Sequence, residues 1–177
     1  MGRATVELFA GRGARVVAVD VDAEALEGLD GVETFTGDVA VEEDNAAAVR
    51  MAVERFGRLD AVVLNAGVSG AGPVEGEGAV AGLDHAGEGI RINALAPGLT
   101  RTRMTAGVRD DPALSEVAVG RIPLRRWAEP REQAEAIWFL ASPAASYITG
   151  TVLAVDGGIG ADNGLLFPPD TPGGDFR

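Results

Sequence analysis

The stretch RVVAVD at residues 15–20 decides the fold of this 177-residue chain. It is a compact apolar run bounded by turns, which predicts a buried strand. Before it, residues 3–10 predict a helix that Gly11 and Gly13 close, and after it residues 32–36 predict a second strand. Because helical patterns alternate with buried strands, the sequence predicts parallel β–α units with right-handed crossovers.

The same alternation continues towards the C-terminus. Apolar residues at helical spacing predict a helix that stops at Gly57, and Pro130 predicts the first residue of another helix. Three further short apolar runs predict buried strands, at residues 60–64, 89–95 and 151–155. The predicted fold class is therefore α/β, with a parallel sheet of about five strands.

The predicted domain organisation follows from the distribution of glycine and proline. We find no internal repeat and no linker, so residues 1–160 are predicted to form a single domain. A glycine-rich stretch near residues 67–89 interrupts the pattern, and no firm element fits there. Residues 161–177 are rich in proline and glycine and are predicted to be a flexible C-terminal tail.

Composition argues against several classes of function. The net charge of −12 and the pI near 4.4 argue against nucleic acid and anionic membranes as partners. No run of about 18 apolar residues appears, so no membrane span is predicted and a cytoplasmic location is expected. Cysteine is absent, and no metal site is predicted. All 15 basic residues are arginines, so the chain has no Schiff-base lysine and no phosphate-loop lysine.

Six short motifs, in a fixed order and at characteristic intervals, resemble the short-chain dehydrogenase/reductase family. The resemblance covers roughly residues 2–70 and 79–163. The motifs are Gly2-Arg3-Ala4, the strand ending in Asp20, Gly37-Asp38-Val39, Asn65-Ala66-Gly67, Ile92-Asn93-Ala94 with Pro97-Gly98 and Thr102, and Thr149-Gly150 with Val155-Asp156-Gly157-Gly158. Each motif alone is common, so the resemblance depends on their order and spacing. It implies a Rossmann-like, doubly wound parallel sheet and NAD-dependent hydride transfer between a small-molecule alcohol and a carbonyl compound.

The resemblance also implies that parts of the family pattern are missing. The chain starts at the last glycine of the family's phosphate loop, so the first strand and two earlier glycines are expected to be absent. Only about ten residues lie between Gly67 and Ala79, where the family has a helix, a strand with the catalytic Ser, and a Tyr-x-x-x-Lys pair. The expected sheet is therefore incomplete, with its strands in the spatial order 32–36, 15–20, 60–64, 89–95 and 151–155.

Most positions that hold the dinucleotide in this family are matched. The resemblance implies that Gly2 opens the helix whose N-terminus meets the pyrophosphate. Asp20 matches the acidic residue that binds the adenosine ribose, which favours NAD over NADP, although the same carboxylate could instead cap the next turn. The remaining matches are Asp38 and Val39 for adenine, Asn65, Ala66 and Gly67 for the wall beside the adenosine ribose, and Pro97, Gly98, Leu99 and Thr102 for the nicotinamide and phosphates.

No catalytic residue is predicted. Tyr147 is the only Tyr and matches a segment before the last strand, Ser69 has no Tyr or Lys beside it, and His85 lies in the glycine-rich stretch. Two interpretations stay open: an oxidoreductase that is inactive as written, or a non-catalytic module that binds a nucleotide or a partner protein. The last helix and strand resemble surfaces with which the family forms homo-oligomers. The substrate loop is expected around residues 100–125, but no substrate is indicated.

Overall fold

A computed structural model describes residues 1–67 and 83–161 of the chain. The chain divides into two compact units, Met1–Gly76 with Pro130–Ile148 and Glu77–Glu129 with Thr149–Arg177, which are described in turn. The single domain predicted over residues 1–160 stays a prediction, and nearly all of the predicted tail lies outside the described residues. Among the residues described, no helix is both long enough and apolar enough to cross a membrane.

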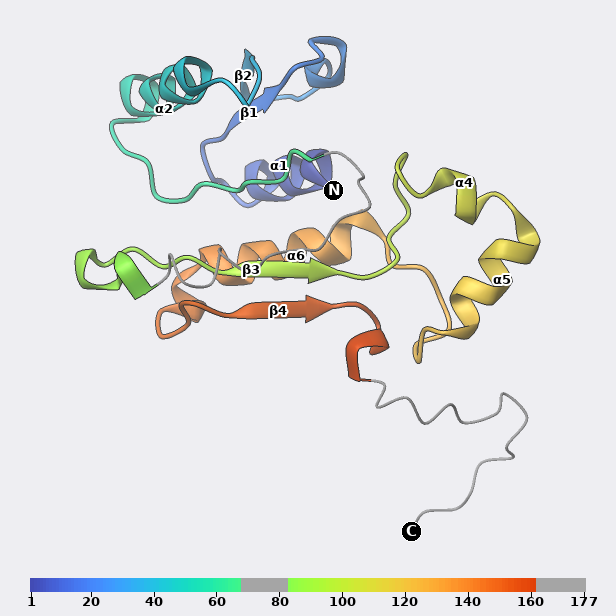
Figure 1. Cartoon of the computed structure of the whole chain (residues 1–177). Helices are drawn as coiled ribbons and strands as arrows, with labels where there is room; N and C mark the ends of the chain where they lie inside the picture. The colour runs from blue at the N-terminus through green and yellow to red at the C-terminus, as the bar shows by residue number, and fades with distance from the viewer. Residues whose placement is uncertain (68–82, 162–177) are drawn as a thin grey trace. The chain divides into compact units, whose positions relative to one another are not determined.

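The first unit contains a parallel pair of strands (Figure 1). Strand β1 (Val17–Asp20) pairs with β2 (Glu33–Thr36), with Val17 opposite Glu33, and a short 3-10 helix, η1 (Glu24–Leu26), lies in their connection. The strands predicted at 15–20 and 32–36, and the parallel direction of the sheet, are confirmed. Strand β1 is partly buried: Ala18 is buried, Val17 and Val19 are half-buried, and Asp20 is exposed.

Helix α2 (Glu42–Phe56) follows β2 and packs against β1. Its first turn carries three acidic residues, which stabilise the positive end of the helix dipole. Gly57 ends the helix with a φ angle of 80°, a left-handed conformation that glycine adopts without steric cost. The predicted stop at Gly57 is therefore confirmed.

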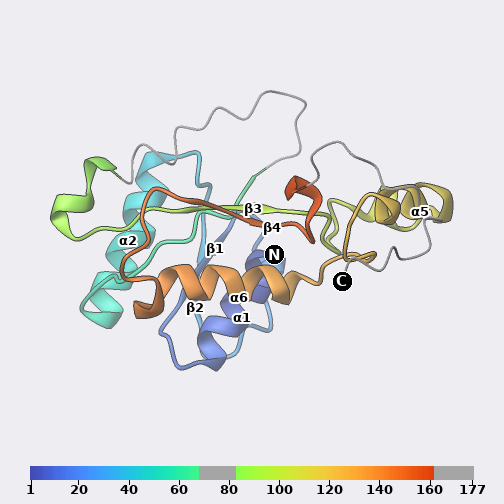
Figure 2. The ribbon, with the colours of Figure 1, turned by 90° about the horizontal axis from the view of Figure 1, so that it is seen from below.

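Two helices that are far apart in the sequence pack together in the same unit. Helix α1 (Gly2–Gly11) contacts α6 (Pro130–Ala141), and Figure 2 shows the pair from below. The rings of Phe9 and Trp138 meet edge to face with their centroids 4.9 Å apart, and the guanidinium of Arg12 lies over the Trp138 ring. Buried Leu8 contributes to the apolar core of this unit, which holds α1 in place.

The second unit is built on another parallel pair. Strand β3 (Ala94–Pro97) pairs with β4 (Val152–Val155), and the two arrows run side by side in the same direction in Figure 1. The strand predicted at 89–95 begins later than expected, because the side chain of Asn93 accepts a hydrogen bond from the Thr151 N–H at 3.2 Å just before the regular ladder starts. The strand predicted at 151–155 is confirmed.

Two short helices follow β3 in this unit. They are α4 (Ala106–Arg109) and α5 (Pro112–Gly120), and the side chain of Asp111 caps the second of them. Trp127 is buried and donates a hydrogen bond from Nε1 to Ser115 Oγ at 2.9 Å. Three short 3-10 helices complete the described elements of both units: η2 (Ala86–Glu88), η3 (Pro143–Ala145) and η4 (Ile159–Ala161).

The predicted five-stranded order is confirmed at its two ends, where 15–20 pairs with 32–36 and 89–95 pairs with 151–155, and was wrong at its middle strand, 60–64. The described residues contain two separate two-stranded sheets, β1–β2 and β3–β4. Residues 60–64 do not form a strand, and the side chains of Val62 and Leu64 are 63% and 91% exposed. The physical reason is that an extended segment becomes a strand only when a neighbour supplies its hydrogen bonds, and no strand among the described residues pairs with this one.

Candidate functional site

The start of α1 brings two of the predicted cofactor residues together. A Cβ atom added to Gly2 would lie 2.6 Å from Asn65 Nδ2, so a larger residue would displace the Asn65 side chain. Among the residues that the structure describes, no side chain caps the N-terminal amides of α1, and its first turn contains no acidic residue. Because such a helix end carries partial positive charge and free amide donors, it can bind an anion such as a phosphate group.

The second predicted contact, Asp20, lies at the carboxyl end of β1 and is exposed. Its Oδ1 accepts a hydrogen bond from the Asp22 N–H at 3.0 Å, so the carboxylate does cap the next turn. For Oδ2 we find no hydrogen bond to any described residue. The capping interpretation of Asp20 is therefore confirmed for Oδ1, and its contact with a ribose stays a prediction.

The turn after β2 holds Asp38 and Val39 firmly. The Asp38 N–H donates to Asp44 Oδ2 and Asp38 Oδ1 accepts from the Ala40 N–H, both at 2.9 Å. The Val39 carbonyl accepts a hydrogen bond from Asn45 Nδ2 at 2.8 Å, while the Val39 side chain is 44% exposed. An apolar side chain fixed in this way can pack against a flat base.

Asn65, Ala66 and Gly67 are exposed in an irregular segment that follows residues 60–64. Of these three, Asn65 lies close to another predicted cofactor residue, Gly2. The remaining predicted cofactor residues belong to the second unit; they are Pro97, Gly98, Leu99 and Thr102.

In the second unit, Gly98 directly follows β3 and lies against Asp156, which directly follows β4. A Cβ atom there would lie 2.5 Å from Asp156 Cα, and the Gly98 N–H donates to the Val155 carbonyl at 3.0 Å. Pro97 is the last residue of β3, and the Leu99 carbonyl accepts a hydrogen bond from the Ala128 N–H at 2.9 Å. This glycine is thus required by the packing of the sheet.

Threonine side chains hold the next segment. Thr105 Oγ1 donates to the Thr100 carbonyl at 2.6 Å and accepts from the Thr102 N–H at 3.1 Å. Thr102 Oγ1 lies 3.3 Å from the same hydroxyl group. The half-buried Thr102 is therefore held in place before α4 begins.

The Asp156 carboxylate fixes the loop after β4. Its Oδ2 accepts a hydrogen bond from the Gly160 N–H at 2.7 Å and its Oδ1 accepts one from the Gly158 N–H at 2.9 Å. These hydrogen bonds, first that of Gly160 and then that of Gly158, lower the pKa of Asp156 below its usual value, because they stabilise the ionised form. At neutral pH the charged carboxylate therefore holds this loop beside Gly98.

The structure describes two of the three residues that were considered for catalysis, Tyr147 and His85. The Tyr147 side chain is fully exposed. The only histidine, His85, is exposed and lies 3.4 Å from the carboxylate of Glu88. Ser69 lies outside the described residues. Within the described part of the chain, no group of three or more His, Asp or Glu side chains could hold a metal ion.

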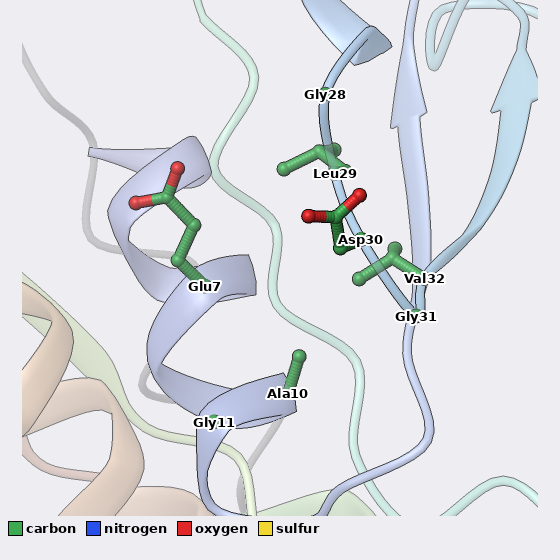
Figure 3. A pocket seen from close by; sticks show the side chains of 8 residues that line it. All are labelled: Glu7, Ala10, Gly11, Gly28, Leu29, Asp30, Gly31 and Val32. Atoms are coloured by element: carbon green, nitrogen blue, oxygen red, sulfur yellow. The ribbon is translucent and has the colours of Figure 1, made fainter.

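Sequence reasoning missed a hollow of about 390 Å³ in the first unit. Figure 3 shows Glu7 and Ala10 of α1 on one side, and the side chains of Leu29 and Asp30 reaching towards the helix from the other. The segment 28–32 carries no motif by which the sequence could have revealed the hollow. None of the predicted cofactor residues lines it, so it is separate from the start of α1.

Comparison with known proteins identifies the family. A sequence model described as enoyl-(acyl carrier protein) reductase matches residues 1–79 and 74–160. The chain is 32% identical over 232 residues to 2,5-dichloro-2,5-cyclohexadiene-1,4-diol dehydrogenase of Sphingobium indicum, covering 91% of this chain and 93% of that enzyme. Galactitol 2-dehydrogenase (L-tagatose-forming) of Cereibacter sphaeroides is 42% identical over 113 residues, a match that spans 60% of this chain and only 44% of that enzyme.

The fold also matches a solved structure. A short-chain dehydrogenase/reductase of Brucella melitensis, titled glucose/ribitol dehydrogenase, superimposes with a TM-score of 0.79 at 25% identity, covering 89% of this chain and 91% of that one. Enzymes of this kind act on small alcohols and carbonyl compounds, and they typically bind NAD(P). With a family model that matches most of its length, this chain belongs to the short-chain dehydrogenase/reductase family of oxidoreductases.

Proposed function

We propose that this chain binds NAD in preference to NADP through its first unit and, as it stands, does not catalyse hydride transfer at the rate of its relatives. The proposal that the chain binds NAD rests on the close approach of Gly2 to Asn65 at the uncapped start of α1. A Cβ atom at Gly2 would clash with Asn65 Nδ2, so the glycine lets Asn65 lie against the backbone, and the uncapped amides of this helix start fit a phosphate group. When bound, NAD would supply the hydride acceptor.

The preference for NAD is argued from Asp20. A carboxylate oxygen without a hydrogen bond among the described residues, at the end of β1, can accept a hydrogen bond from a ribose hydroxyl. The same negative charge repels the additional phosphate group of NADP. The side chain of Val39 offers an apolar surface for the adenine, and the hydrogen bonds of the turn after β2 hold the backbone at this residue in place.

The lack of turnover is argued from the groups that proton transfer would need. Reduction of a ketone leaves an alkoxide that an acid must protonate, and a positioned acid or base contributes about 10²–10⁴-fold to the rate. The whole sequence contains no Lys that could lower the pKa of a tyrosine, and its single Tyr is fully exposed.

The comparisons support a missing internal segment. The alignment with the Sphingobium enzyme extends over 232 positions, although this chain has only 177 residues, so part of that enzyme has no counterpart here. The family model matches in two stretches that meet around residues 74–79, inside the interval where the resemblance places the missing Ser strand and Tyr-x-x-x-Lys pair.

The test combines binding and turnover. Calorimetry should give tighter binding of NAD than of NADP, and Asp20→Ala should reduce this preference by roughly 10- to 100-fold, the effect of one hydrogen bond to a charged group. Asp30→Ala removes the same charge from an exposed loop position in the same unit and should leave the ratio unchanged. Tight NADP binding by the unmodified chain would contradict the cofactor assignment.

Turnover is measured separately, by NADH formation with a panel of secondary alcohols. We expect no activity above about 1 s⁻¹, the low end of ordinary enzymes. A chimera that receives the missing segment from a full-length relative should regain activity. Steady turnover by the unmodified chain would show that another residue acts as the acid.

A further inference from the structure

We propose that Arg3 is a positioning residue, which holds the loop after β1 against the start of α1 and thereby sets where the Asp20 carboxylate meets the adenosine ribose. The inference rests on the proposed function, because the position of Asp20 matters only if a dinucleotide binds there. Its basis is a set of hydrogen bonds that join two sides of the proposed cofactor site.

The guanidinium of Arg3 donates hydrogen bonds from all three of its nitrogen atoms. Nε donates to Glu7 Oε1 at 2.9 Å, and Nη1 donates to the carbonyl oxygens of Ala25 at 3.2 Å and Glu27 at 3.1 Å. Nη2 donates to the carbonyl oxygens of Glu27 at 3.1 Å and Gly28 at 3.3 Å. A planar guanidinium can satisfy such a spread of acceptors at once, whereas the ammonium group of lysine acts as a single point charge.

The acceptors lie where the loop needs support. η1 has only three residues, and its last carbonyl groups have no further helical turn to bind them. From the first turn of α1, Arg3 supplies donors to one of these, the Ala25 carbonyl, and to the carbonyls of Glu27 and Gly28 just after η1. Because its side chain is about half exposed, the contribution comes from the geometry of several hydrogen bonds more than from net charge.

A continuous series of hydrogen bonds connects Arg3 to Asp20. Arg3 binds the Ala25 carbonyl, the Ala25 N–H donates to the Asp22 carbonyl at 3.1 Å, and the Asp22 N–H donates to Asp20 Oδ1 at 3.0 Å. Each bond fixes one step of the turn. The distance from the helix start that would meet the pyrophosphate to the carboxylate that would meet the ribose therefore depends on Arg3.

The experiment follows three backbone amides by hydrogen exchange in the purified full chain. The N–H groups of Ala25, Leu26 and Glu27 each donate within the turn and η1, so their exchange reports on the stability of this loop. In Arg3→Ala and Arg3→Lys we expect exchange roughly tenfold faster or more, since even one hydrogen bond from a charged group is worth about that factor. Arg50→Ala, which removes an exposed arginine from α2, is the matched control and should change nothing in these amides.

The second measurement is the ratio of NAD to NADP dissociation constants. Arg3→Lys should bring the two dissociation constants closer together, which reduces the preference for NAD. The double variant Arg3→Lys with Asp20→Ala should have the same ratio as Asp20→Ala alone, because Arg3 acts through Asp20. Unchanged amide exchange, or faster exchange with an unchanged ratio, would overturn the inference. If the wild-type chain binds neither dinucleotide, the proposed function fails, and the cofactor role of Arg3 fails with it even if the amides exchange faster.

Discussion

Replacing Gly98 with alanine should destabilise the second unit by about 2–4 kcal/mol. The added Cβ atom would lie 2.5 Å from Asp156 Cα and 2.9 Å from its carbonyl oxygen, whereas ordinary contacts begin near 3.4 Å. Because the obstacle is backbone, the ends of β3 and β4 must move apart by about 1 Å. Overpacking of this kind costs about 1–3 kcal/mol, and loss of the hydrogen bond from the Gly98 N–H to the Val155 carbonyl adds about 0.5–1.5 kcal/mol.

The assay is urea denaturation followed by circular dichroism, with Gly107→Ala as the matched control. Gly107 lies in α4 of the same unit and a Cβ atom there would meet nothing within 4 Å. Alanine at that helical position should raise stability by about 0.5–1 kcal/mol. The reasoning would be refuted if Gly98→Ala unfolded at the same urea concentration as the unmodified chain, since the clash with Asp156 and the hydrogen bond that it breaks would then cost nothing.

Three further predictions follow from contacts in the two units. Asp156→Asn should lower the free energy of unfolding at pH 7 and make that free energy fall less steeply below about pH 4. The reason is that the Asp156 carboxylate, whose pKa is lowered in the folded chain, stabilises the fold at pH values above its unfolded pKa, near 4, and stops doing so as the pH drops through the lowered pKa. Thermal unfolding across pH 3–7 measures the stability and its pH dependence. Trp127→Phe should cost more than Ser115→Ala in urea denaturation, because both variants lose the hydrogen bond, worth about 0.5–1.5 kcal/mol, and the smaller ring also leaves a cavity at a buried position. Adding Ser115→Ala to Trp127→Phe should cost little more, since the hydrogen bond is already lost. Gly2→Ala should leave thermal stability nearly unchanged, because the exposed Asn65 side chain can turn away, but should weaken dinucleotide binding measured by calorimetry.

The sequence predicted the local elements better than their assembly. Strands β1 and β2 were predicted because their apolar runs and turns are local signals, and α2 was predicted to stop at Gly57 for the same reason. The run at 60–64 has equal apolar character, yet it forms no strand in the structure. Strand formation there depends on a neighbour that composition does not encode.

The same limit applies to the candidate site. Gly98 matches a cofactor motif, but its closest contact is Asp156 in the neighbouring strand's loop, so sheet packing alone would select a glycine at this position. A motif cannot distinguish these two requirements. The sequence also could not predict the hydrogen bonds of Arg3, because their acceptors lie 22–25 residues further along the chain. Residue spacing does not reveal the path of the loop that carries them.

The pairing of α1 with α6 has a consequence for the order of events on the ribosome. Arg12 and Glu135, which form an ion pair at 2.6 Å between these helices, are 123 residues apart. At the usual elongation rate of about 5–20 residues per second, the apolar face of α1 waits roughly 6–25 s for its partner helix to be synthesised. During that interval Leu8 and Phe9 stay open to water or to a chaperone, so α1 is synthesised well before the partner helix that covers its apolar face.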